Sequence, residues 1–168
     1  LGDIGTGGAA GAIYRGTPSG TLSPLTTTGP AYPTALALSA DGLDVYVTGT
    51  DPDPQNASPG VWRIPLSGGA PVTVYKGTPL VQPAGVTIAS DGSLYVADTR
   101  AAPSGQGAVF RIVGDRIFQI SKSGLRFNFP TGLAPAGRNT PDVLLATARS
   151  VGNEPWLLNE VPGNGNGL

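Results

Sequence analysis

The chain has 168 residues, enough for one domain with a hydrophobic core, and its 10 Lys and Arg nearly cancel its 11 Asp and Glu, leaving a net charge of −1. This balance offers no basic surface for nucleic acid, and the absence of cysteine and histidine excludes disulfides, Cys/His zinc sites, thiol nucleophiles and imidazole bases. Glycine (26) and proline (17) are abundant while charged residues make up only 12%, which predicts an all-β chain rich in turns.

Short aromatic clusters recur along the chain with aromatic positions 48, 48 and 46 residues apart. A second set of segments, each beginning with proline, runs in phase with the first. Internal repeats with a period in the forties are typical of β-propeller blades, each built from four antiparallel strands. The aromatic clusters are Ile13–Arg15, Val61–Arg63, Val109–Arg111 and Pro155–Leu157, and the proline-led segments are Pro33–Leu38, Pro83–Ile88 and Pro130–Pro135.

In the first two copies the proline-led strand is followed closely by Asp-Gly, at Asp41-Gly42 and Asp91-Gly92. Glycine at these positions supplies the positive φ angle of a tight hairpin turn. A second strand follows each turn, then a variable loop, the aromatic strand and a fourth strand. The second strands are Val45–Val47, Leu94–Val96 and Val143–Leu145, and the fourth strands are Val72–Tyr75 and Ile117–Ile120.

This repeat divides the chain into about three blades, so we expect a single partial β-propeller. We expect the two outer strands of a split blade over 1–30, whole blades over 31–80 and 81–127, and the inner strands of a further split blade over 128–168. Propellers close with about four to eight blades, so three leave a sheet edge and a blade face uncovered. The ring would be completed by a second copy, by another chain or by the rest of a longer parent protein.

The stretch PAGVTIASDGSLYVADT, followed by GAVFRI, resembles the NHL repeat and is similar, more loosely, to the gluconolactonase (SMP-30)-like six-bladed propellers. The resemblance covers nearly the whole chain and implies about half of a six-bladed ring. It also implies metal ligands at the residue after the proline of each inner strand. That residue is Thr34, Ala84 or Thr131 here, and none of the three is a carboxylate or an amide.

By analogy with propellers, ligands are expected on the face formed by the loops that lead into each innermost strand and out of each second strand. The candidate ligand-binding residues on this face are Tyr32, Gln82, Asn128, Asp98, Arg100 and Arg149. The resemblance also offers a purely structural role for Asp98, which ends a strand and would bond to backbone there.

A metal-like cluster lies in the loop Asp51-Pro52-Asp53-Pro54, because hard cations such as calcium prefer several oxygen ligands. Calcium is the one cofactor that the sequence suggests, and a solvated turn is the alternative. Arginine occupies one repeat position in three copies and could form an anion-binding ring, although packing along the strand beside an aromatic residue is favoured. These arginines are Arg15, Arg63 and Arg111.

Two functions follow from these observations. The favoured one is a non-catalytic propeller that binds a protein, peptide or glycan, or acts as a scaffold. The alternative is a lactonase-like hydrolase or lyase with a divalent metal in the central channel. The sequence contains no run of about 18 apolar residues that would span a membrane, and its few lysines with many Thr, Gly, Pro and Asn suggest a secreted or periplasmic protein.

Overall fold

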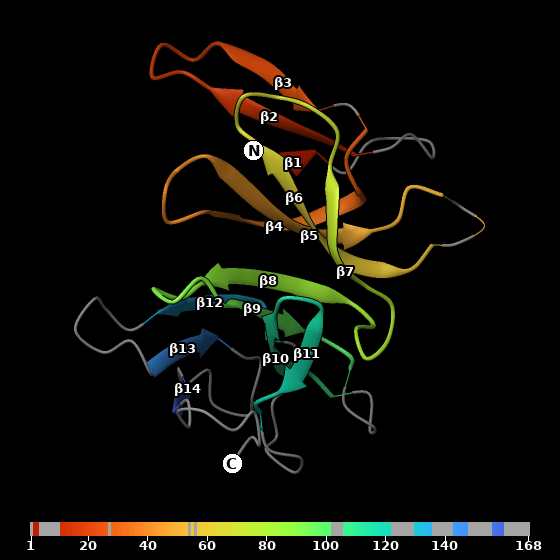
Figure 1. Ribbon diagram of the computed structural model, residues 1–168, viewed down its shortest axis with the longest axis vertical. Helices are drawn as coiled ribbons and strands as arrows, with labels where there is room; N and C mark the ends of the chain where they lie inside the picture. The colour runs from red at the N-terminus through yellow and green to blue at the C-terminus, as the bar shows by residue number, and fades with distance from the viewer. Residues whose placement is uncertain are drawn as a thin grey trace.

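The computed structural model describes residues 2–3, 11–26, 28–53, 55, 57–101, 106–121, 130–135, 143–147 and 156–159. Every regular element among them is a β-strand, and these strands form four antiparallel sheets that follow one another along the chain (Figure 1). The described part of the chain contains no helix with the length and hydropathy needed to cross a membrane.

The two central sheets each contain four strands in sequence order, and the two terminal sheets each contain three described strands. All strand pairs are hairpins or meanders, so each sheet is formed by a local stretch of chain. The first sheet consists of β1 (Gly2–Asp3), β2 (Ala12–Gly16) and β3 (Leu22–Thr26); the second of β4 (Ala31–Leu38), β5 (Asp44–Thr50), β6 (Pro59–Pro65) and β7 (Val72–Lys76). The third consists of β8 (Pro83–Ile88), β9 (Leu94–Asp98), β10 (Ala108–Val113) and β11 (Arg116–Gln119); the fourth of β12 (Gly132–Pro135), β13 (Val143–Thr147) and β14 (Trp156–Asn159).

These sheets confirm the all-β partial propeller and the strands predicted from the repeat. Gly42 and Gly92 have φ angles of 71° and 84°, as the Asp-Gly turns require. The N-terminal sheet differs from the prediction, because β1 pairs with β2 and gives this sheet three described strands instead of two. A two-residue strand has no periodicity of its own, so the sequence could not reveal it.

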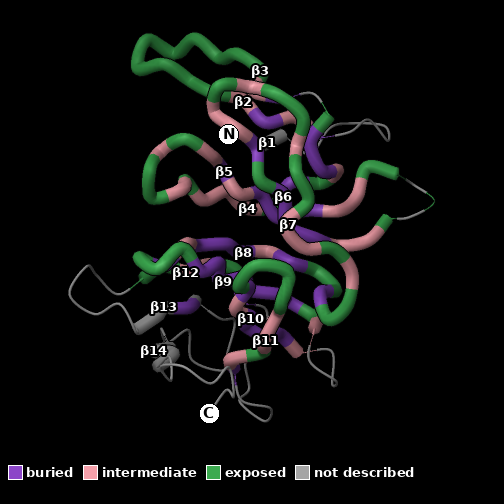
Figure 2. Tube along the Cα trace, in the orientation of Figure 1, coloured by how far each residue is buried: buried purple, intermediate pink, exposed green. Residues whose placement is uncertain are grey.

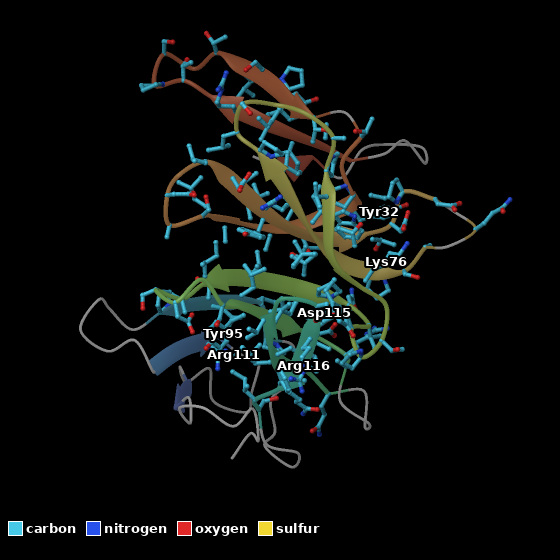
Figure 3. All side chains as sticks on the ribbon, viewed as in Figure 1. Tyr32, Lys76, Tyr95, Arg111, Asp115 and Arg116 are labelled. Atoms are coloured by element: carbon cyan, nitrogen blue, oxygen red, sulfur yellow. The ribbon has the colours of Figure 1, made fainter. Side chains whose placement is uncertain are left out.

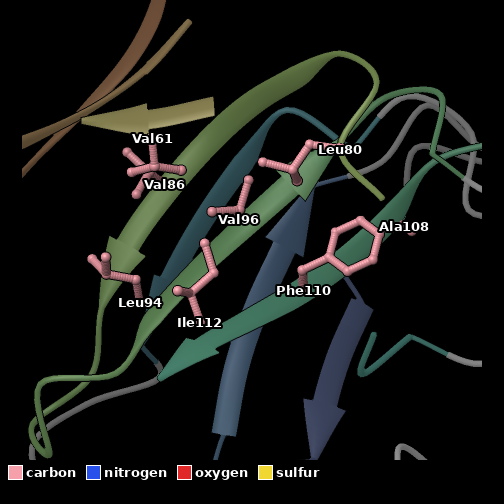
Figure 4. Packing of buried hydrophobic residues seen from close by; sticks show 8 residues of the cluster. All are labelled: Val61, Leu80, Val86, Leu94, Val96, Ala108, Phe110 and Ile112. Carbon is pink, nitrogen blue, oxygen red and sulfur yellow. The ribbon is translucent and has the colours of Figure 1, made fainter. Parts of the chain in front are cut away.

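Neighbouring sheets pack face to face through apolar clusters, which is why their strands are buried on both sides (Figure 2). Alternate residues of a strand serve opposite faces: Val96 belongs to the cluster between the second and third sheets, and Tyr95 to the cluster between the third and fourth. The largest cluster, shown in Figure 4, joins Val61 of β6 to the third sheet and contains Val61, Leu80, Val86, Leu94, Val96, Ala108, Phe110 and Ile112.

The first strands of successive complete sheets lie beside each other, with β4 against β8 and β8 against β12. The Thr34 hydroxyl of β4 donates a hydrogen bond to the carbonyl of Pro83 in β8, at 2.7 Å. The backbones of β8 and β12 also approach closely, because a Cβ atom at Gly85 would lie 2.5 Å from the carbonyl oxygen of Thr131. Glycine at 85 is therefore required by the approach of the next blade.

Candidate ligand-binding pocket

A pocket of about 280 Å³ lies between the second and third sheets, where the chain enters β4 and β8 and leaves β5. It is formed by two complete blades, so its walls do not depend on how the ring is closed. Two of the predicted ligand-binding residues, Tyr32 and Gln82, line it together although they are 50 positions apart in the sequence. The full lining is Tyr32, Thr34, Gly49, Thr50, Val81, Gln82 and Pro83.

Tyr32 has an unusual backbone conformation for an aromatic residue. Its side chain is labelled in Figure 3. Its φ angle is +50°, in the left-handed region, and the residue is 57% exposed. Such a conformation costs a non-glycine residue about 1–3 kcal/mol and is found most often at functional sites. The register between β4 and β5 shifts between Ala31 and Ala35, which places Tyr32 in an irregular segment at the start of β4.

Asp98 holds the opposite wall of the pocket in place and is not among its lining residues. One oxygen of its fully buried carboxylate accepts the N–H groups of Val81 and Gln82, at 2.8 and 2.9 Å, and the other accepts that of Arg100, at 2.9 Å. The Gln82 carbonyl accepts hydrogen bonds from Thr99. The main chain that carries Val81 and Gln82 is therefore fixed on both sides, and Asp98 has the framework role that its strand-end position suggested.

The other predicted channel-face residues do not join this pocket. Arg100 is exposed directly after β9, and its described hydrogen bond is made by its backbone N–H. Asn128 and Arg149 lie outside the described residues. The pocket residues outside the predicted ligand-binding set are Thr34, Gly49, Thr50, Val81 and Pro83. Most of them lie where the chain enters an innermost strand or leaves a second strand, on the face where ligands are expected.

The Asp51 carboxylate, proposed as a calcium ligand, forms an ion pair with Lys76 at 2.7 Å and accepts the N–H of Asp53 at 2.9 Å. The hydrogen bond from Lys76, with that from the Asp53 backbone, lowers the pKa of Asp51 below its usual value. The Asp53 carboxylate in turn accepts the N–H of Gln55. These are the bonds of consecutive Asx turns, and the described residues contain no group of three or more Asp, Glu, His or Cys suited to a metal. Calcium binding remains a prediction.

The three repeated arginines bond to the framework. Arg111 donates to the Asp91 carboxylate at 2.8 Å and to the Ser93 hydroxyl at 2.9 and 3.1 Å, which ties β10 to the Asp-Gly turn of its own blade. Burial opposes ionisation of Asp91, but the bonds from Ser93 and Arg111 outweigh it and lower its pKa. Arg63 lies 3.9 Å from Asp44 at the corresponding turn, and the Arg15 guanidinium donates to the Leu66 carbonyl at 3.5 Å.

The inner-strand positions that carry metal ligands in lactonase-like propellers show no coordinating arrangement among the described residues. The Thr34 hydroxyl is shared between the Pro83 carbonyl and the Thr48 hydroxyl, at 2.7 and 2.9 Å. Ala84 offers only a methyl group. The backbone oxygen of Thr131 faces Gly85 at close range.

No protein-family model matches the sequence, and a search of curated proteins finds no match. Solved structures do share the fold, which makes this chain part of a β-propeller. A chain of a nidogen–laminin complex has 16% identity and a TM-score of 0.63, with 89% of this chain and 57% of the matched chain covered. A gluconolactonase from Xanthomonas campestris has 18% identity and a TM-score of 0.63, over 90% of this chain and 45% of the enzyme.

A periplasmic gluconolactonase from Pseudomonas aeruginosa has 16% identity and a TM-score of 0.57, with 86% of this chain and 44% of the enzyme covered. The chain thus spans about half the length of the propellers that it resembles. At these identities the likeness defines the fold and does not define an activity.

Proposed function

We propose that the chain is part of a non-catalytic β-propeller that binds a ligand in the pocket between its second and third sheets. The observation that carries this proposal is the convergence of Tyr32 and Gln82, from two different blades, on one pocket of about 280 Å³. The wall opposite Tyr32 is fixed by Asp98, and a rigid wall reduces the entropy that binding must overcome. The likeness to a chain of a nidogen–laminin complex supports a protein or peptide as ligand.

The alternative is a lactonase-like hydrolase or lyase with a divalent metal in the central channel, and its support is the fold shared with two gluconolactonases. The hydroxyl and methyl groups at positions 34, 84 and 131 argue against this alternative, because a metal site there would need carboxylates or amides. Metal analysis of the purified protein, combined with a lactone-hydrolysis assay, separates the two functions. Stoichiometric calcium or zinc together with hydrolysis would overturn the binding module.

We further propose that the complete ring has six blades and that polypeptide outside the described strands closes it. The candidates for that polypeptide are a second copy, another chain or the rest of a parent protein. The three described strands of each terminal sheet bear on the choice. If two copies merged their terminal sheets across a two-fold axis, each merged blade would contain six strands instead of four, so a second copy fits least well.

Light scattering tests this last point. A mass of one chain at all concentrations would reject completion by a second copy. A stable mass of two chains would support completion by a second copy. We also propose a secreted or periplasmic location, which the periplasmic gluconolactonase supports, and secretion of the tagged gene product can be followed by cell fractionation.

A further inference from the structure

Two exposed apolar side chains meet in the pocket, one from each blade. Tyr32 is 57% exposed and Val81 is 54% exposed, and both belong to the lining. Isolated exposed apolar residues are common on protein surfaces, but two that share a concave site on separate blades present an apolar contact to a ligand.

The polar groups of the pocket are few and neutral. Its lining contains no charged residue, and the Asp51 carboxylate that follows Thr50 is paired with Lys76. The Thr34 hydroxyl already donates to the Pro83 carbonyl. This leaves the Gln82 carboxamide, the Thr50 hydroxyl and the Tyr32 hydroxyl, to which no other described residue forms a hydrogen bond.

This polar inventory favours a peptide over a sugar. A carboxamide offers one acceptor and an NH₂ donor, which matches the N–H and C=O of a single peptide unit. A pyranose buried in the same pocket would bring several hydroxyl groups, and each one without a partner costs about 1–3 kcal/mol. The size agrees, because about 280 Å³ lies just below the range of pockets for drug-sized ligands and is suited to one side chain.

We propose that the pocket binds an extended peptide segment through one neutral aliphatic or proline side chain. The side chain lies between Tyr32 and Val81, and the Gln82 carboxamide pairs with the peptide backbone beside it. This inference rests on the proposed binding function and adds its ligand class. A charged side chain is rejected, because the pocket provides no opposite charge and burial of an unpaired charge is strongly unfavourable.

The test is a titration of the ¹⁵N-labelled protein with capped peptides, followed by NMR through the backbone amides of Gly49, Val81 and Gln82. The probes are acetyl-Gly-Gly-X-Gly-Gly-amide with X as Leu, Pro, Glu or Lys, and methyl glucoside. We expect saturable shifts of these amides with Leu and Pro, and binding at least about tenfold weaker with Glu and Lys. Val81→Ser and Gln82→Ala should each weaken Leu-peptide binding severalfold.

Val113→Ser is the matched control, because Val113 is 45% exposed at the end of β10 and is not part of the lining. It should leave peptide binding unchanged. Equal binding of the charged peptides, or a saturable response to methyl glucoside without one to Leu, would overturn the peptide assignment while leaving a binding module. Metal-dependent lactone hydrolysis would instead overturn the proposed function itself, so the two failures are distinguishable.

Discussion

Replacing Gly85 with alanine tests a close backbone contact between the third and fourth sheets. The new Cβ atom would lie 2.5 Å from the Thr131 carbonyl oxygen and 3.1 Å from its carbonyl carbon, whereas real Cβ atoms essentially never approach within 3.0 Å. The contact is with backbone, so no rotation of a side chain relieves it, and β8 and β12 must move apart. Overpacking of this kind costs about 1–3 kcal/mol.

The free energy of unfolding, measured by urea denaturation followed by tryptophan fluorescence, should fall by about this amount. In a chain of this size each kcal/mol lowers the melting temperature by about 2–4 °C. Gly29→Ala is the matched control, because its Cβ atom would meet its nearest neighbour at 3.4 Å, an ordinary contact. It should be neutral or gain up to about 1 kcal/mol through the unfolded chain. If Gly85→Ala unfolds at the wild-type urea concentration, the close approach of β8 and β12 is wrong.

Three further outcomes are expected. Asp98→Asn should lower the free energy of unfolding, measured by urea titration, by about 1–3 kcal/mol. The reason is that an amide cannot accept three buried backbone N–H groups as the carboxylate does. A urea midpoint equal to that of the wild type would refute this role of Asp98. The pKa of Asp91 is lowered in the folded state, so its stabilisation is present above the unfolded value of about 3.9 and is lost as the pH falls through the folded value. Unfolding followed from pH 7 to pH 3 should therefore show a shallower loss of stability in Asp91→Asn than in the wild type, by at most about 1 kcal/mol since the group is half exposed. For the calcium hypothesis at Asp51 and Asp53, calorimetric titration should show calcium binding that Asp53→Asn weakens, and no heat of binding would reject it.

The hairpins were predictable because their chemistry is local. In the turns at Asp41 and Asp91 the carboxylate accepts the backbone N–H two residues later, at 3.0 and 2.8 Å, and glycine follows each aspartate with a positive φ angle. These bonds join residues within five positions of one another, so a short stretch of sequence is enough to predict them. Because the same motif recurs along the chain, the turn and strands identified in one blade predict those at the same positions of the next blade.

The pocket was predictable only in part, because it depends on register between distant strands. The repeat places Tyr32 and Gln82 in the loops that lead into inner strands, and the structure brings these two residues together. Val81 and Thr50 line the same pocket from two different blades, and no local pattern contains the placement of one blade against the next. Nor does the sequence distinguish a carboxylate that binds a ligand from one that, like Asp98, holds the loop that does.

Asp98 holds the main chain of residues 81 and 82, so the groups that fix the shape of the pocket differ from the groups that contact a ligand. Their main-chain groups are anchored by a carboxylate from the neighbouring strand, while the exposed side chains of Val81 and Gln82 make no contribution to that anchoring. Substitutions at these two positions should therefore leave the fold intact while changing what is bound. This makes the pair a starting point for diversifying the protein into binders of new specificity, either by natural divergence or in a designed library.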